Sequence, residues 1–191
     1  MDQRQLIDFM NKIEKLKCNT RHSYTSSGRP ESVAEHSWRL AVLAMLCKDE
    51  FPEADMNKVI RMALLHDLGE AITGDVASFY KTDENRRAEA EATEMLLSML
   101  PEPYKSEFRA LFDEMAERKT PEAKLLKALD NTEAVISHNE ADISTWIPLE
   151  YEENLIYGEK NCAWSPWLAE FRKILKEDSI IKINNEKDAS L

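Results

Sequence analysis

Residues 59–75 read VIRMALLHDLGEAITGD, and this stretch indicates how the chain folds. Its apolar residues recur at the spacing of one helix face, with Val59 and Met62 on that face. His66 continues the same face, and Asp67 follows it directly. The stretch therefore predicts a helix whose buried side ends in an imidazole and a carboxylate.

Helical spacing of apolar residues continues through most of the chain. Two helix starts are marked by the capping pattern Ser32-Val-Ala-Glu35 and by Thr120-Pro121. We expect an apolar helical stripe at 6–16 and helices at 32–51, from 55 onward, at 83–100, up to 119, at 121–142 and from 166 onward. No segment reads as a convincing strand, so the sequence predicts an all-α fold, a single-domain helical bundle.

The composition is that of one globular domain. The chain has 191 residues, of which 43% are hydrophobic and 32% are charged, enough apolar residues to bury a core. Its 36 acidic and 25 basic residues give a net charge of −11. Because this charge repels a polyphosphate, a nucleic-acid polymer is not expected as the main partner.

The cysteines and the N-terminus indicate the cellular compartment of the protein. Cys18, Cys47 and Cys162 are scattered and odd in number, which argues against a disulfide framework and fits a reducing compartment. The chain begins MDQRQLIDFM, which is charged from the second residue and unlike a signal peptide. Its apolar runs are far shorter than a membrane span. We expect a soluble cytoplasmic protein with no membrane partner.

Four polar residues lie on apolar helix faces. They are His36, His66, Asp67 and Asp130, from three different predicted helices. Burying them without partners is costly, and one divalent metal would satisfy all four. Two imidazoles and two carboxylates suit Mn²⁺, Fe²⁺, Co²⁺, Ni²⁺ or Zn²⁺, with Mg²⁺ as a further option. Each residue alone also has an ordinary structural role, such as a surface pair between Asp130 and Lys127.

Two acidic residues follow the His-Asp pair at short distances. Glu70 comes four residues after His66 and projects towards the same side of a helix, while Gly74 permits a turn that brings Asp75 back. A carboxylate beside a metal-bound water can transfer a proton. We interpret Glu70 and Asp75 as candidate catalytic residues, against the alternatives of a solvated glutamate and a turn-forming aspartate.

These residues together resemble a known family. His36, His66-Asp67 and Asp130 reproduce the H…HD…D pattern of the HD-domain metal-dependent phosphohydrolases. The segments ESVAEHSWR (31–39), HDLGEAITGD (66–75) and KALD (127–130) are similar to the bacterial HD-domain 5′-deoxynucleotidases and to related small HD-domain proteins of eukaryotes.

The resemblance implies roles for individual residues. The H…HD…D residues would bind a single catalytic metal, Glu70 would transfer a proton or orient water with Asp75 beside it, and Arg21 would contact the substrate phosphate. The chain departs from the bacterial pattern at His22, where those nucleotidases have tryptophan, and His22 is a candidate substrate contact or a loop histidine. Lys81, six residues after Asp75, is a candidate second cation or an ordinary surface lysine.

The expected activity is hydrolysis of (deoxy)nucleoside 5′-monophosphates to nucleoside and phosphate, with a small phosphorylated partner. Two alternatives stay open: the same site acting on another small phosphoester or phosphonate, and a non-enzymatic metal-containing bundle that binds nucleotides. We expect one domain at 1–184, comprising a metal-site core at 6–142 and a helical extension at 143–184, and a polar tail at 185–191.

Other side chains receive structural interpretations. His138 is expected to be exposed near a helix end, and Trp38, Met45 and Met62 are expected in the core. Aromatic residues are frequent in the last third of the chain, where they would cover the core or bury a homodimer interface.

Overall fold

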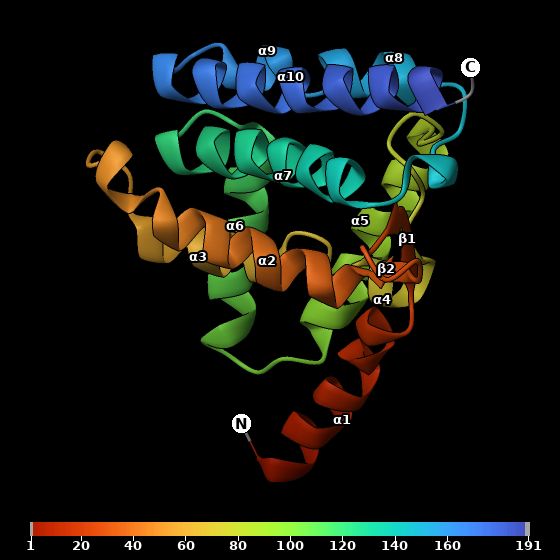
Figure 1. Cartoon of the computed structure of the whole chain (residues 1–191). Helices are drawn as coiled ribbons and strands as arrows, with labels where there is room; N and C mark the ends of the chain where they lie inside the picture. Colours follow the sequence, from red (N-terminus) through yellow and green to blue (C-terminus); the bar gives the residue numbers. More distant parts are fainter. Residues whose placement is uncertain (1, 190–191) are drawn as a thin grey trace.

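The computed structural model describes residues 2–189, and this part of the chain is mostly helical (Figure 1). The helices are α1 (Gln3–Ile13), α2 (Val33–Leu46), α3 (Met56–Leu65), α4 (Glu70–Thr73), α5 (Asp83–Ser98), α6 (Tyr104–Glu117), α7 (Pro121–Glu140), α8 (Glu150–Ile156), α9 (Glu159–Cys162) and α10 (Pro166–Ala189). Short 3-10 helices lie at Glu14–Lys17, Lys48–Glu50 and Ile143–Thr145, and two strands are β1 (Thr20–Tyr24) and β2 (Pro30–Ser32). The predicted all-α fold class is confirmed. None of the described helices combines the length and the apolar character needed to cross a membrane.

Helix α7 lies at the centre of the fold. Helix α10 packs along one side of it, and α2 and α3 pack along the other (Figure 1). Leu125 and Leu129 of α7 are fully buried in one apolar cluster with Leu40 of α2, Met62 of α3 and Leu168 of α10. Because α2, α3 and α7 share this core, polar side chains on their inner faces are brought close together.

A second, smaller core joins α1 to the α4–α5 region. Phe9 of α1 is buried with Leu68, Leu96, Leu97 and Leu100. The rest of α1 extends away from the body of the molecule, as Figure 1 shows at the bottom of the view. The N-terminal helix is therefore anchored at one face and open to solvent along the other.

The antiparallel hairpin of β1 and β2 was not predicted from the sequence. Thr20 pairs with Ser32 and Tyr24 with Pro30, with an irregular register between them. The segment is short and rich in Ser, Thr and Arg, so it lacks the alternation of apolar residues by which a strand is predicted. The hairpin delivers the chain directly to Ser32, which caps α2 in a complete capping box with Glu35.

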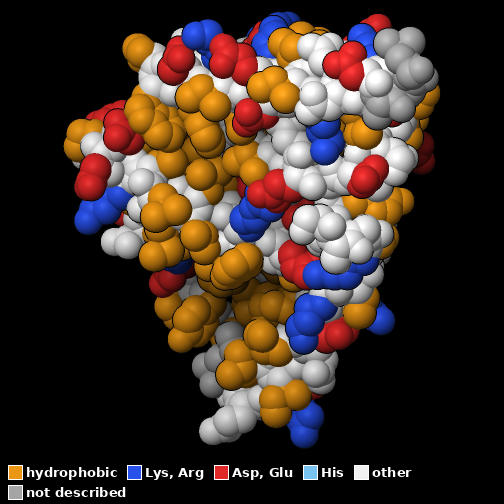
Figure 2. All heavy atoms as spheres, in the orientation of Figure 1, with side chains coloured by type: hydrophobic (Ala, Val, Ile, Leu, Met, Phe, Trp, Pro, Cys, Tyr) orange, Lys and Arg blue, Asp and Glu red, His pale blue; other side chains and the backbone are white. Residues whose placement is uncertain are grey.

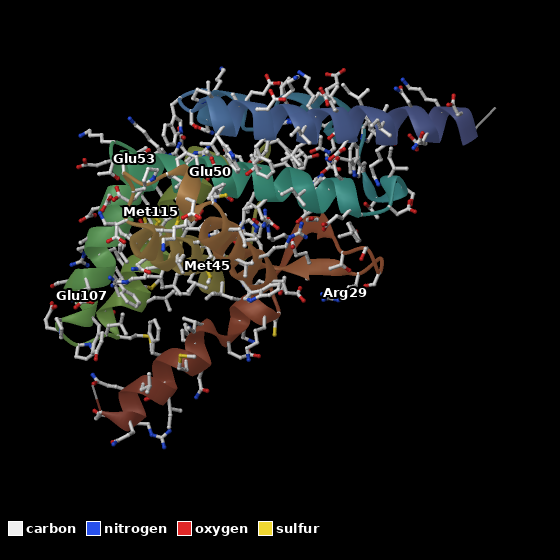
Figure 3. The ribbon with its side chains drawn as sticks, turned by 60° about the vertical axis from the view of Figure 1, so that its left-hand side comes forward. Arg29, Met45, Glu50, Glu53, Glu107 and Met115 are labelled. Carbon is white, nitrogen blue, oxygen red and sulfur yellow. The ribbon has the colours of Figure 1, made fainter. Side chains whose placement is uncertain are left out.

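Several helix ends and exposures also differ from expectation. Helix α2 ends at Leu46, short of the predicted residue 51, and α10 continues past residue 184. Met62 is buried as expected, but Trp38 and Met45 are 63% and 58% exposed. His36, Leu40 and Ala44 occupy the inner face of α2, so Trp38 and Met45 lie on its outer side, where Figure 3 labels Met45.

Candidate metal centre

Four predicted ligand residues come together where α2, α3 and α7 meet. His36 lies in α2, His66 and Asp67 directly follow α3, and Asp130 lies in α7. Ligand atoms of His36, His66 and Asp67 all lie within 4.8 Å of one another. Asp130 Oδ1 lies 3.2 Å from His36 Nε2 and 3.8 Å from His66 Nε2.

Each of the two imidazoles is held through its Nδ1 atom. His36 Nδ1 hydrogen-bonds to the carboxylate of Glu133, and His66 Nδ1 lies 2.9 Å from the carbonyl oxygen of Ala63. Both Nε2 atoms are buried without a hydrogen-bond partner among the described residues. Two unpartnered imidazole nitrogens beside two carboxylates fit the donor set of a divalent metal.

The carboxylates carry charge in this setting. Burial alone would raise the pKa of Asp130, but the Lys127 ammonium and His36 lower it well below its usual value. Burial would likewise raise the pKa of Asp67, and His66 lowers it. Asp130 does pair with Lys127, through Oδ2 at 2.8 Å, which leaves Oδ1 facing the two histidines. The ion pair of Asp130 with Lys127 is therefore compatible with a role of Asp130 as a metal ligand.

Glu70 lies beside this cluster and is almost completely buried. It begins α4, and its Oε2 has no hydrogen-bond partner among the described residues. Burial, followed by the negative charges of Asp67, Asp75 and Glu89, raises the pKa of Glu70 to about 10. With protein groups alone around it, Glu70 is therefore protonated at pH 7, and a cation near Asp67 would lower its pKa.

Asp75 returns to the site through the turn at Gly74. Gly74 has φ 73° and ψ 168°, a backbone conformation that side-chain-bearing residues rarely adopt. Burial raises the pKa of Asp75, and the nearby Arg21 charge opposes that effect. Glu70 begins the four-residue helix α4 and Asp75 follows its end, and the two are close enough to influence each other's protonation.

A cavity of about 480 Å³ opens in front of these residues. This volume lies in the range of sites for small ligands. Its wall includes all the predicted site residues except His36, which lies behind the wall: Arg21, His22, His66, Asp67, Glu70, Asp75, Lys81 and Asp130. Met115 of α6, labelled in Figure 3, contributes to the apolar part of the wall.

Comparison with known proteins places this arrangement in a family. Residues 13–170 match the HD domain. The chain belongs to the HD-domain family. The resemblance stated from the sequence is thereby confirmed, over a longer stretch than the motifs that indicated it.

Two relatives of this HD-domain chain are proteins of eukaryotes. It is 35% identical over 141 residues to the human protein named 5′-deoxynucleotidase HDDC2, covering 72% of this chain and 68% of that protein. The Xenopus laevis protein of the same name is 36% identical over 154 residues, with 78% and 71% covered.

A solved structure from Magnetospirillum magnetotacticum, described as a predicted metal-dependent phosphohydrolase, is also similar. It superposes with a TM-score of 0.78 at 27% identity, covering 94% of this chain and 93% of that one. An HD-domain phosphohydrolase from Listeria innocua shares the fold, with a TM-score of 0.70 at 21% identity, covering 95% and 92% of the two chains.

Arg21 and His22 of β1 lie beside the metal-site residues. The Arg21 side chain is 15% exposed, and its Nη1 lies 3.8 Å from Glu31 Oε2 and 3.7 Å from Glu133 Oε2. His22 Nε2 lies 3.2 Å from Glu150 Oε1, and its ring meets Phe79 edge-on at 5.8 Å. Lys81 is paired with Glu89, and its Nζ lies 3.9 Å from Glu70 Oε1.

The expectation for His138 is wrong, because helix α8 covers it. Its side chain is 14% exposed, and its Nδ1 lies 3.4 Å from Glu150 Oε1 and 3.3 Å from Asn154 Nδ2. Burial, with the charges of Arg21 and His22, lowers the pKa of His138 to about 4. His138 is therefore a neutral part of the cavity wall at pH 7.

Three buried glutamates around the site were missed by sequence reasoning. Glu31 and Glu133 contact Arg21, and Glu150 contacts His22. Glu133 had a usable signal, since it follows Asp130 by three residues and so lies on the same face of α7. Glu150 had none, because its position depends on how the C-terminal helices fold back on α7.

Proposed function

We propose that this protein is a metal-dependent 5′-nucleotidase that hydrolyses (deoxy)nucleoside 5′-monophosphates to nucleoside and phosphate. One observation carries the proposal: two unpartnered Nε2 atoms and two charged carboxylates meet at a cavity where a protonated carboxyl, Glu70, is also present. The names of the relatives support the same activity and the deoxynucleotide preference.

In this proposal, His36, His66, Asp67 and Asp130 hold one divalent transition metal, such as Mn²⁺, Co²⁺, Fe²⁺, Ni²⁺ or Zn²⁺, with Mg²⁺ as a further option. Neutral imidazole and carboxylate together suit metals of intermediate softness. When bound, such an ion polarises a phosphate oxygen and lowers the pKa of water.

The protein's own residues then position the substrate and move protons. Arg21 presents its guanidinium to phosphate oxygens, a geometry that suits two parallel hydrogen bonds. Lys81 adds a second positive charge beside Glu70, and His22 contacts the nucleoside. Glu70 or Asp75 holds or takes the proton of the water as the water oxygen bonds to phosphorus. The bond between phosphorus and the 5′ oxygen breaks, and this oxygen gains a proton and leaves as a hydroxyl.

The test is phosphate release from a panel of ribo- and deoxynucleoside 5′-monophosphates. The protein is stripped of metal, and Mn²⁺, Co²⁺ or Mg²⁺ is restored in turn, with Asp67→Ala as the metal-site control. We expect metal-dependent release that favours deoxynucleotides and is absent in Asp67→Ala. Release from other phosphoesters but from no nucleotide would overturn the nucleotidase assignment, and no release from any phosphoester would favour a binding role.

The partner and the compartment are proposed on separate grounds. We propose a homodimer, because exposed apolar side chains of α1 and α2 form a broad band on one face (Figure 2). Monomers rarely expose large contiguous apolar patches, and homodimer interfaces are rich in apolar surface. The three cysteines are free, which suits a reducing compartment, and we propose the cytoplasm.

A further inference from the structure

We propose that Glu133 is a positioning residue that fixes the metal ligand His36 and the phosphate-binding Arg21 relative to each other. This inference rests on the proposed function, since it assumes a metal at His36. It concerns a residue that neither the sequence motifs nor the cavity wall includes.

Glu133 is fully buried, and both of its carboxylate oxygens are engaged. Oε2 accepts the hydrogen bond from His36 Nδ1 and lies 3.7 Å from Arg21 Nη1. Oε1 accepts a hydrogen bond from the Ser137 hydroxyl at 3.1 Å and lies 3.4 Å from Arg39 Nε. A carboxylate held by four groups has little freedom, so it can set the orientation of the imidazole that it contacts.

The contact decides which nitrogen of His36 is available to a metal. A carboxylate between two guanidinium groups is ionised, so it keeps the proton on His36 Nδ1. In the neutral imidazole the lone pair is then on Nε2, which is buried, lacks a hydrogen-bond partner among the described residues and lies 3.2 Å from Asp130 Oδ1. A carboxylate behind a ligating histidine fixes its tautomer and raises its basicity.

Glu31, His36 and Glu133 also lie close enough together to hold an ion themselves. The surrounding charges argue against a second metal there. Arg21 Nη1 lies within 4 Å of both carboxylates, and Arg39 approaches Glu133 from the other side. A divalent cation among them would face two guanidinium groups, so the glutamates pair with the arginines and with His36 instead.

The same oxygen of Glu133 faces both His36 and Arg21. Its position therefore sets the spacing between the group that holds the metal and the group that binds phosphate. Catalytic constellations depend on such spacing, because small misplacements of a binding group are costly. Loss of the Glu133 carboxylate is expected to weaken both metal binding and phosphate binding.

The experiment measures metal binding without substrate. Stripped Glu133→Gln protein is titrated with Mn²⁺ and Co²⁺ by calorimetry, and the visible absorption of the Co²⁺ protein is recorded. We expect affinity about 10- to 100-fold weaker than in the unsubstituted protein, with an altered Co²⁺ spectrum. Inhibition by inorganic phosphate gives the second readout, and it should weaken as well.

The matched control is Glu122→Gln, another buried carboxylate of α7. Glu122 accepts a hydrogen bond from the Asp55 backbone and faces Lys58, away from the cavity. Its substitution should leave the metal affinity and the Co²⁺ spectrum unchanged. An equal loss in both variants would overturn the proposal, because it would mark a general effect of altering α7.

A second variant keeps the inference testable if Glu133→Gln does not fold, as judged by circular dichroism. Glu133→Asp keeps the charge between the arginines but is one methylene too short for His36 Nδ1, so metal affinity should still fall. Wild-type affinity and spectrum in whichever variant folds would overturn the positioning role alone. A parent protein that binds neither ion would overturn the proposed function together with this inference.

Discussion

The carboxyl of Glu70 combines burial with three negative neighbours, and its pKa of about 10 is the result. Such a group is neutral at pH 7 with protein groups alone around it, and a cation at Asp67 would lower its pKa. A carboxyl poised in this way beside a water that must lose a proton suits general acid–base catalysis. Lys81, which lies 3.9 Å from Glu70 Oε1, favours the charged form once the proton is lost.

Replacement of Glu70 by Gln tests that role. Gln has the shape of the protonated carboxyl, so the four metal-site residues should keep their arrangement and the metal content should stay unchanged. Turnover should fall by at least about 10²-fold, because an amide cannot transfer the proton. Phosphate release and metal content by mass spectrometry are measured together, with Asp67→Ala as the variant that loses the metal. Normal turnover with metal bound would remove Glu70 from the mechanism.

The sequence indicates which residues come together where the signal lies within one helix or one short motif. His36 and Asp130 stand on apolar helix faces, and His66 and Asp67 directly follow the buried face of α3, so their approach follows from helical spacing. Glu133 and Glu150 were missed, because their contacts depend on how helices pack, which periodicity does not report. Glu31 was missed together with the hairpin that brings it to Arg21.

At the level of elements, the junction of α4 and α5 holds Glu70 in place. Gly69, just before α4, packs so closely on α5 that an added Cβ would lie 2.6 Å from Thr93 Oγ1 and 2.7 Å from the carbonyl oxygen of Glu89. Only a residue without a side chain permits this approach. The same helix pair carries Glu89, the partner of Lys81, so the packing distance bears on the site.

Gly69→Ala should therefore destabilise the fold by about 1–3 kcal/mol, the usual range for overpacking. Urea unfolding followed by circular dichroism measures the change. Thr93→Ala in the same chain should recover part of the loss, because it removes the nearer of the two clashing atoms while the Glu89 carbonyl remains. Additive effects of the two substitutions would show that the clash does not govern stability.

The start of α2 makes stability depend on pH. The Arg29 hydrogen bond, the Ser32 backbone and the Arg29 charge lower the pKa of Glu35 to about 2, from a usual 4.5. A lowered carboxyl pKa stabilises the folded protein above pH 4.5, and this contribution is lost as the pH falls towards 2. Glu35→Gln should thus destabilise the protein by about 1 kcal/mol or less, since the pair is partly exposed.

Urea unfolding at pH 6 and at pH 3.5 checks this prediction. The difference between the parent and Glu35→Gln should be largest at pH 6 and smaller at pH 3.5. Glu53→Gln is the control, because Glu53 is an exposed carboxylate on the loop after α2 (Figure 3). A difference that is equal at both pH values would mean that the charge of Glu35 does not stabilise the helix start.

The hairpin was not predicted, although it carries two residues of the candidate site. Helices here are long enough for their apolar period to be read, whereas β1 and β2 have five and three residues. Strands this short and polar carry no period. The hairpin was therefore expected to be a loop, although it is the element that holds Arg21 and His22 at the cavity.

For the whole molecule, charge and apolar surface are distributed unequally. The net charge of −11 opposes contact between two copies over most of the surface. Figure 2 shows apolar side chains gathered over α1 and α2. The exposed large apolar residues of these two helices are Leu6, Ile7, Met10, Trp38, Met45 and Leu46, all at least 45% exposed. A second copy is the partner we propose, because it offers an equally apolar face and the contact at this band brings few charges together.

Trp38→Glu tests this arrangement, because it places a charge in the α2 part of the band. Light scattering with size-exclusion chromatography should give twice the chain mass of 22.0 kDa for the parent and the single-chain mass for the variant. Tyr80→Glu is the matched control, since Tyr80 is 62% exposed, close to the 63% of Trp38, but lies on the loop between α4 and α5. It should stay dimeric. A parent that is monomeric at micromolar concentration, or a dimer that tolerates Trp38→Glu, would show that another surface or no second copy covers the chain.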